Sequence, residues 1–500
     1  MRMAAKWIAR SALLVLVGSA VISCGDDSDA DGSPSGGTAG TGGTAGSGGT
    51  LPQGGKAPSE GGSDTGGKSA MGGAGGAADG GSAGESEPIV GGAAGDGGAE
   101  EPGSGGAPPE AGAGGAAGDG GMGGAAGESD PGGAAGAAGA PEVIEGMHIY
   151  VGCSNSSGTI QRYVFDRNVG DFTLLGSVAA GSGLSAAVLH PDGERLYVSH
   201  GSQGRITIFE RDPFTGGLEE LDSVTVPFDP ENPSGSTKNP QIAALAVDSG
   251  GTHLAVASAA SDLVLAFALD EDGLVGDVAG FDGAGLTPRD VLFNTTDGFV
   301  VVPYADSDKV VAHEFDEGDL KTEVETSLPA DSGPNGVAMH PNGDWLYVLN
   351  GSEGSVSFFA FDENSGAMNH VETIDVPVPD DFVGPERNAS AIAITPNGKF
   401  LYVTSRLDGV EDGTLATFAI TASGPDAGKL DLLDPGGVIG TEGVGPSDFA
   451  ISEDGTFLVV ANEESDTIAG FNLNAATGAP VLVKTRTACN GPQFVLIVTN

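Results

Sequence analysis

Two alternating apolar runs, separated by turn residues, make up the stretch 340–362, HPNGDWLYVLNGSEGSVSFFAFD. Strict alternation bounded by Gly, Asn and Ser predicts two half-buried strands joined by a tight hairpin. The same unit recurs seven times, and its first strand occupies 149–153, 196–200, 254–258, 300–304, 346–350, 401–405 and 458–462. A repeat of this kind indicates stacked copies of one small sheet.

Each repeat has two further strand signals, an apolar segment before a D-G or N-G turn and a short strand after the second hairpin. The first repeat lacks the leading segment, because it opens directly at His148, and a matching segment occurs at the far end of the chain, at 493–498. We therefore predict an all-β, seven-bladed β-propeller that closes by pairing its N- and C-terminal strands. Such closure removes the open edges of the sheets.

The first residues have the features of an export signal. Residues 1–23 combine a basic start with an apolar core, 11–22, that is too short for a typical transmembrane helix. The sequence VISC at 21–24 matches the bacterial lipobox, so we predict that Cys24 is lipidated and anchors the protein to a membrane of the cell envelope. The alternative is an ordinary signal peptide followed by an incidental cysteine.

Residues 24–141 consist almost entirely of Gly, Ala, Ser, Asp, Glu and Pro. Such a composition cannot bury an apolar core, so we predict a disordered, acidic linker that separates the anchor from the propeller domain at 142–500. The chain has 69 acidic and 20 basic residues, a net charge of -49. This acidity argues against nucleic acid as a partner and against docking onto anionic lipid. We expect a monomer.

Cys153 and Cys489 are the two cysteines outside the N-terminal segment. They lie at the same end of the predicted split blade, so a disulfide that locks the ring is sterically possible if the loop before the last strand curls back.

No Cys/His cluster with zinc spacing and no phosphate-binding glycine loop occurs, so we expect neither a metal nor a cofactor. His190 and His340 precede PDG and PNG turns and are expected to cap them. Asp262, Asp308 and Asp466 fall at hairpin turns, where they are expected to bond their own backbone.

The sequences HPDGERLYVSH, SAIAITPNGKFLYVTSR and SDFAISEDGTFLVVANEESDTIAGFNLNAATG resemble the seven-bladed lactonase family, which includes propeller-type 6-phosphogluconolactonase and the muconate lactonizing propeller. The resemblance covers 148–500. Most of the family's catalytic positions are changed in this chain. Arg289 stands in place of a histidine, Asn335 and Gly336 replace an Arg-His pair, Gly351 replaces a glutamate, with Glu353 displaced by two places, and Arg406 matches the family's arginine.

The predicted mouth of the ring gathers polar residues from the starts of first strands and the ends of second strands. This set comprises His200, Gln241, Arg289, Asp290, Tyr304, Asn335, Arg387, Asn388, Arg406, Asp448, Glu463 and Gln493. Mixed cations and carboxylates suit an anionic or hydroxylated ligand. The alternative is that these groups form hydrogen bonds with one another and with water in the channel, and bind no ligand.

Two functions remain open at this point. In the first, the mouth binds a sugar acid, glycan or protein loop without chemistry, and the ligand-binding residues are Asp290, Tyr304, Asn335, Arg387, Asn388 and Asp448. In the second, which the resemblance implies, the chain is a lactone hydrolase. Arg406 and Arg289 would then polarise the lactone carbonyl, and His200 or Glu463 would transfer the proton.

Overall fold

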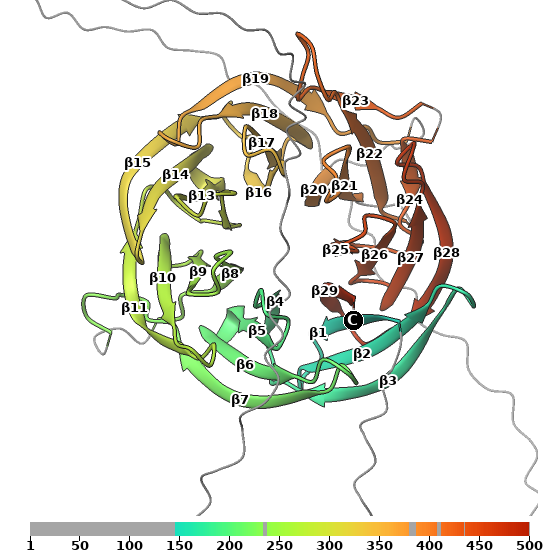
Figure 1. The fold of residues 1–500 in the computed structure, drawn as a ribbon, viewed down its shortest axis with the longest axis horizontal. Helices are drawn as coiled ribbons and strands as arrows, with labels where there is room; N and C mark the ends of the chain where they lie inside the picture. The colour runs from blue at the N-terminus through green and yellow to red at the C-terminus, as the bar shows by residue number, and fades with distance from the viewer. Residues whose placement is uncertain (1–145, 234–237, 380–386, 408–411, 435, 500) are drawn as a thin grey trace, which may run out of the picture. The chain divides into compact units, whose positions relative to one another are not determined.

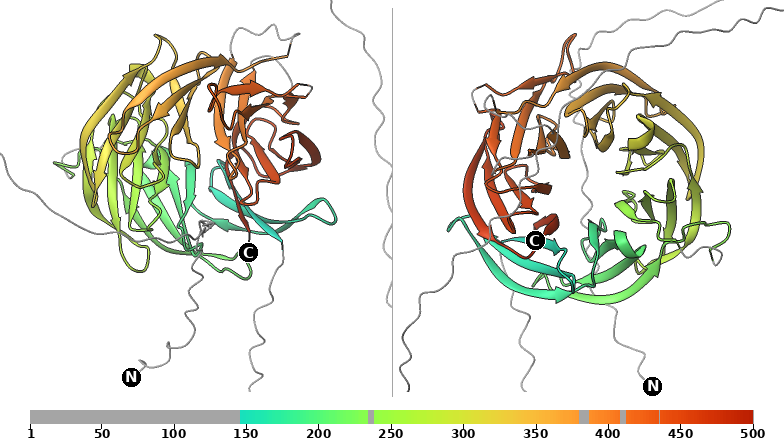
Figure 2. Two further views of the ribbon diagram at one scale, coloured as in Figure 1. Left: turned by 45° about the horizontal axis from the view of Figure 1, so that its top comes forward. Right: turned by 180° about the vertical axis from the view of Figure 1, so that it is seen from behind.

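The computed structural model describes residues 146–499 apart from 234–237, 380–386, 408–411 and 435. The predicted signal segment, Cys24 and the linker lie outside the described residues. The described part forms six four-stranded antiparallel sheets and one of five strands, arranged radially as seven blades (Figure 1). The two further views show the same ring obliquely and from behind (Figure 2). The predicted seven-bladed all-β fold is therefore confirmed.

Blades are numbered along the chain, and their strands are given from the inside of the ring outward. Blade 1 contains β29 (Pro492–Thr499), β1 (Met147–Cys153), β2 (Thr159–Asp166) and β3 (Asp171–Ala179). Blade 2 contains β4 (Leu184–Leu189), β5 (Arg195–His200), β6 (Arg205–Arg211) and β7 (Leu218–Thr225). Blade 3 contains β8 (Ile242–Val247), β9 (His253–Ser258), β10 (Leu263–Leu269) and β11 (Val275–Asp282).

Blade 4 contains β12 (Leu292–Phe293), β13 (Phe299–Tyr304), β14 (Lys309–Asp316) and β15 (Asp319–Ser327). Blade 5 contains β16 (Pro334–Met339), β17 (Trp345–Asn350), β18 (Ser355–Phe361) and β19 (Met368–Asp375). Blade 6 contains β20 (Arg387–Ile394), β21 (Phe400–Leu407) and β22 (Thr414–Ile420), which pairs with both β23 (Leu430–Leu432) and β24 (Val438–Gly440). Blade 7 contains β25 (Pro446–Ile451), β26 (Phe457–Asn462), β27 (Thr467–Leu473) and β28 (Pro480–Thr487).

Two short 3₁₀ turns follow second strands, η1 (Gly201–Gln203) in blade 2 and η2 (Ala305–Ser307) in blade 4. No helix among the described residues is long and apolar enough to cross a membrane.

The ring closes through its two ends, as the sequence predicts. β1 pairs antiparallel with β29, with Met147 opposite Thr499 and Gly152 opposite Phe494. A disulfide joins Cys153, at the end of β1, to Cys489 in the loop before β29, with 5.8 Å between the two Cα atoms. The seam is therefore held by a strand ladder and by a covalent bond across 336 residues of sequence.

The apolar core consists of seven clusters of buried side chains, one between each pair of neighbouring blades. Tyrosines of the LYV-type strands add a polar link to four of these interfaces. Tyr347 and Tyr402, for example, donate to the carbonyls of Gly428 and Gly478 in the next blade, both over 2.6 Å. Those glycines have φ of 86° and 73°, a conformation that glycine adopts without strain.

Turn residues also link the blades. The predicted caps are confirmed, because the Asp192 and Asn342 N–H groups donate to Nδ1 of His190 and His340. The Nε2 of each histidine also reaches the glycine carbonyl of the equivalent turn in the next blade, Gly251 for His190.

The prediction for the three hairpin aspartates was wrong in one respect. Asp262, Asp308 and Asp466 accept from backbone N–H groups, but those groups belong to the loop that leads into the next blade. All three residues have positive φ, which turns their carboxylates away from their own hairpin.

We expect replacement of Cys489 by alanine to lower the free energy of unfolding by about 2–4 kcal/mol, because the disulfide restricts the unfolded chain over a very long loop. Urea unfolding of the wild type with and without reductant, beside Cys489→Ala, measures this change. Reductant should shift the wild-type midpoint and leave that of the variant in place. Identical midpoints for all three would show that the bond does not stabilise the ring.

Candidate functional site

A one-residue shift in the ladder occurs near the start of the innermost strand of every blade. A bulge of this kind takes one side chain out of the alternation and re-aims it. The seven equivalent residues are Ser185, Ala243, Arg289, Asn335, Ser390, Ser447 and Gln493. Three of them reach the next blade: Ser185, Asn335 and Ser447 donate to the carbonyls of Ile242, Ala389 and Pro492.

A second ring of equivalent residues lies at the end of the second strand of each blade, one position after the strand in six blades and within β21 in blade 6. It consists of Ser154, Gly201, Ala259, Ala305, Gly351, Arg406 and Glu463. Five of the seven are small, and the two charged ones belong to neighbouring blades 6 and 7. Blades 1 to 5 therefore carry small residues at this level of the ring, and blades 6 and 7 carry two large charged side chains, here called the charged wall.

Two cavities lie where the small residues are, with volumes of about 680 and 440 Å³. Arg289 and Asn335 line both of them. The larger cavity is completed by Ala305, Asp306, Asp308, Asp331, Gly333, Gly351, Ser352 and Asn388. The smaller is completed by Ser185, Gly201, Ser202, Gln241, Ile242, Ala243 and Ala259. Of the residues predicted at the mouth, the structure thus brings Gln241, Arg289, Asn335 and Asn388 together.

The larger cavity contains one cation and three carboxylates. Among the described residues, the Arg289 guanidinium and the Asp331 carboxylate have no hydrogen-bond or ion-pair partner, and both are exposed. Asp308 accepts from the N–H groups of Asp331 and Gly333, at 2.9 and 3.0 Å. Burial raises the pKa of Asp308, but these hydrogen bonds outweigh that effect and lower it, so this side chain stays ionised and fixes the loop.

Asp306, Asp308 and Asp331 were missed as site residues by the sequence reasoning. For Asp308 the sequence predicted only a structural role in its hairpin turn. Asp331 lies in a loop before β16, where no strand pattern indicates which way a side chain points.

Arg406 and Glu463 form the charged wall. The Arg406 Nη2 lies 2.5 Å from the Glu463 carboxylate, and Arg406 Nε donates to the Pro446 carbonyl over 3.1 Å. Gln493 Nε2 donates to the other oxygen of Glu463 over 2.7 Å. Three predicted mouth residues therefore contact one another in the structure. The positive charge of Arg406 is compensated by the carboxylate of Glu463 and is not free for a ligand. None of the three lines either cavity.

Asp290 lies two residues before β12 of blade 4, and Asp448 lies on β25, the innermost strand of blade 7. Each accepts a backbone N–H from the neighbouring blade, that of Val337 at 2.9 Å for Asp290 and that of Val495 at 3.0 Å for Asp448. Both residues are half-buried.

Burial raises the pKa of Asp290 to about 6 and that of Asp448 to about 7, against the lowering effect of the hydrogen bonds, and the charge of Asp290 contributes to the rise at Asp448. The two carboxyls therefore interact with one another.

Two predicted mouth residues lie inside the blades instead. His200 has 0% exposed surface, its Nδ1 contacts the Ser182 carbonyl at 2.9 Å, and its Nε2 contacts the Thr207 hydroxyl at 2.9 Å. Tyr304 is equally buried, and its hydroxyl contacts His313 Nε2 at 3.1 Å. Neither side chain faces the cavities. Arg387 begins β20, but its side chain lies outside the described part of the chain.

Comparison with known proteins gives a consistent picture. The family model "Lactonase, 7-bladed beta-propeller" matches residues 148–497. A Serratia proteamaculans protein named 6-phosphogluconolactonase is 27% identical over 335 residues, which cover 66% of this chain and 93% of the relative. A Pectobacterium carotovorum protein of the same name is 27% identical over 336 residues, covering 66% of this chain and 92% of the relative.

Two solved structures illustrate the likeness in fold. A Lactobacillus plantarum protein is 20% identical, with a TM-score of 0.61, covering 71% of this chain and 100% of its own. A Pseudomonas aeruginosa periplasmic gluconolactonase is 24% identical, with a TM-score of 0.60, covering 70% of this chain and 99% of its own.

The raised pKa values predict a pH-dependent loss of stability. A carboxyl whose pKa is higher in the folded state stabilises the fold at low pH, and that contribution is lost as the pH rises through 6 and 7. We therefore expect the stability of Asp448→Asn relative to the wild type to improve between pH 5 and pH 8, by about 1.4 kcal/mol for each pH unit from 5 up to the folded-state pKa of about 7.

Urea unfolding at both pH values measures this difference. Asp454→Asn is the matched control, because the pKa of Asp454 is lowered to about 2 and its relative stability should not change over this range. Parallel pH profiles for the wild type and Asp448→Asn would contradict the prediction.

Proposed function

The chain belongs to the seven-bladed lactonase family, and we propose that it hydrolyses the ring ester of a lactone in the larger cavity at the mouth of the ring. The observation that carries this proposal is the pair of uncompensated charges in that cavity. Arg289 and Asp331 both line it, and neither is paired with another described residue. They form no ion pair with one another, and we infer that a substrate binds between them in this cavity of about 680 Å³.

Ester hydrolysis needs the two kinds of group that this pair supplies. The Asp331 carboxylate accepts a proton from a water molecule as the water oxygen attacks the lactone carbonyl carbon. The Arg289 guanidinium stabilises the negative charge that develops on the carbonyl oxygen. The bond between the carbonyl carbon and the ring oxygen then breaks, and the ring oxygen takes up the proton. The product is an open-chain hydroxy acid.

This assignment differs from the one that the sequence suggests. His200 is buried with both ring nitrogens occupied, so it is not available as a base. Arg406 is neutralised by Glu463, so its charge acts on the substrate less than that of Arg289 does. Arg289 occupies the place of a family histidine, and in our proposal it supplies a cation instead of a proton-transfer group.

The charge of the cavity also bears on the substrate. Three carboxylates, those of Asp306, Asp308 and Asp331, surround a single guanidinium. A phosphate group would be repelled by these carboxylates, whereas hydroxyl groups can donate to them. We therefore propose an uncharged hydroxylated lactone as the substrate class. The curated relatives above are named for a phosphorylated one.

The test is lactone hydrolysis by the full chain, followed as acid release, across sugar, phosphorylated sugar and aliphatic lactones. We expect turnover of uncharged sugar lactones, with kcat/KM about a hundredfold lower in Arg289→Gln and in Asp331→Asn. Arg167→Gln is the matched control, because Arg167 pairs with Asp454 and lies outside both cavities. Turnover that survives in both site variants would refute the assigned residues.

The second candidate function is ligand binding without chemistry. The observation that favours it is that no histidine lines either cavity. Saturable binding of gluconate, lost in Arg289→Gln and unaccompanied by turnover of any lactone, would establish this function in place of hydrolysis.

We also propose that Cys24 is lipidated and that the protein resides in a bacterial cell envelope. The support is the lipobox VISC after a basic and apolar N-terminal segment. On expression in bacteria, the wild type should partition into the detergent phase, and its N-terminal peptide should carry acyl groups by mass spectrometry. Cys24→Ala should stay in the aqueous phase. An unacylated wild-type N-terminus would contradict the proposal.

A further inference from the structure

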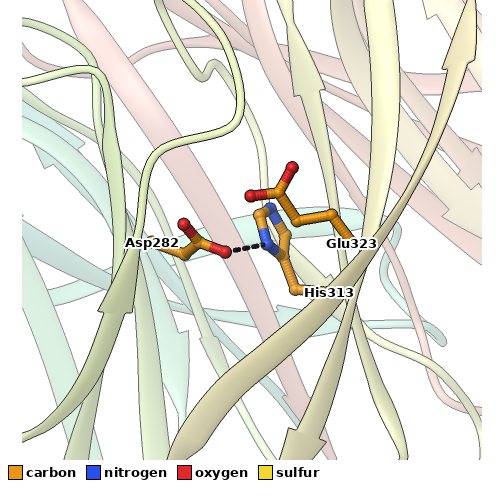
Figure 3. A group of neighbouring side chains, drawn as sticks. All are labelled: Asp282, His313 and Glu323. Atoms are coloured by element: carbon orange, nitrogen blue, oxygen red, sulfur yellow. Dashed lines mark hydrogen bonds and ion pairs between the residues drawn. The ribbon is translucent and has the colours of Figure 1, made fainter.

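Three potential metal ligands converge between blades 3 and 4, away from the mouth of the ring. Asp282 ends β11, the outermost strand of blade 3, and His313 and Glu323 belong to β14 and β15 of blade 4 (Figure 3). His313 and Glu323 lie directly opposite one another in the β14–β15 ladder, so their side chains share one face of the sheet. One ligand atom from each of the three residues lies within 4.8 Å of the other two.

The imidazole of His313 is held in position by a hydrogen bond to its Nε2 atom. His313 is fully buried, and its Nε2 contacts the Tyr304 hydroxyl at 3.1 Å, which leaves Nδ1 directed at Asp282 over 3.3 Å. A hydrogen bond on the second ring nitrogen is the usual way in which proteins orient a metal-binding histidine. The other two ligands remain reachable from solvent, because the Asp282 side chain is 27% exposed and Glu323 is exposed.

This cluster of three side chains has more negative than positive charge. Two carboxylates face one imidazole, and among the described residues neither carboxylate forms an ion pair with a lysine or arginine. Lys309, on the same blade, pairs with Glu325 instead. A cation held between Asp282 and Glu323 would remove the repulsion between them.

We propose that Asp282, His313 and Glu323 form a binding site for a divalent transition metal ion of the zinc class. One imidazole nitrogen and two carboxylate oxygens are ligands that Zn²⁺ accepts, whereas Mg²⁺ and Ca²⁺ prefer oxygen ligands alone. Metal–ligand bonds of about 2.0–2.2 Å require the ligand atoms to approach to about 3–4 Å, a small movement for the exposed Glu323 side chain. Three protein ligands leave a coordination position for water.

The site would join two blades. Its ligands come from β11 and from β14 and β15, so an ion bound there adds a link across the interface between blades 3 and 4. Because the ion binds the folded chain, we expect it to raise the thermal unfolding midpoint. This inference is independent of the lactonase proposal, since none of the three residues lines either cavity at the mouth.

Titration of the full chain with ZnCl₂ by calorimetry, after removal of metals with a chelator, tests the proposal. We expect one saturable equivalent of Zn²⁺, with affinity at least tenfold lower in Asp282→Asn and in Glu323→Gln. Glu325→Gln is the matched control, because Glu325 lies two residues along the same strand and pairs with Lys309. Co²⁺ bound at the site should give a visible absorption spectrum that Glu323→Gln loses.

Three results would overturn the proposal. One is the absence of saturable Zn²⁺ binding to the wild type. Another is equal affinity in the wild type, Asp282→Asn and Glu323→Gln, which would locate the binding elsewhere on this acidic protein. The third is displacement of Zn²⁺ by equimolar Ca²⁺, which would indicate a site of oxygen ligands without His313.

Discussion

Each blade of this protein buries both of its faces against neighbouring blades, and the rest of the structure depends on that requirement. A two-faced apolar sheet cannot lie at the end of a stack, so the stack has to close on itself. The seven apolar clusters account for the seven interfaces of a closed ring. The seam lies within blade 1, where the ladder between β29 and β1 and the Cys153–Cys489 disulfide hold the two ends of the domain together.

Polar side chains fix how neighbouring blades align. Backbone ladders run within the blades, and side chains that reach across add hydrogen bonds between neighbouring blades. Tyr402 donates a hydrogen bond to the Gly478 carbonyl, and His340 Nε2 contacts the Gly398 carbonyl. Asp308 accepts a hydrogen bond from the Gly333 N–H in the loop that leads into blade 5. Each of these contacts recurs in part of the repeats, with the tyrosine in four second strands, the histidine before two turns and the aspartate in three S-D hairpins. The repeated motifs therefore specify contacts between blades as well as strands within them.

The sequence predicted the architecture well and the site only in part, for a physical reason. Alternation and turn residues identify strands, and they predicted the seven blades, the closure and the cysteine pair. Side-chain direction at strand ends is harder to predict. His200 and Tyr304 are the last residues of β5 and β13 and are fully buried. Arg406 and Glu463 occupy the next equivalent position of their repeats, and their side chains are 32% and 31% exposed. A one-residue difference reverses the direction, and bulges add a further shift.

The bulged positions explain how the ring can change its chemistry without losing its fold. Their side chains have left the ladder alternation, so the strand pairing places little constraint on their identity, and in this chain they range from Ala243 to Arg289. Three of them stabilise the fold by donating a hydrogen bond to the next blade. The Arg289 side chain makes no hydrogen bond to any described residue. A side chain freed from structural contacts at a fixed place above the channel can be exchanged at low cost. The departures from the family that the sequence resemblance suggests at Arg289 and Asn335 fall at these positions, and the one suggested at Gly351 falls in the second ring. Changes at such positions can alter the mouth of the ring while the seven blades stay intact.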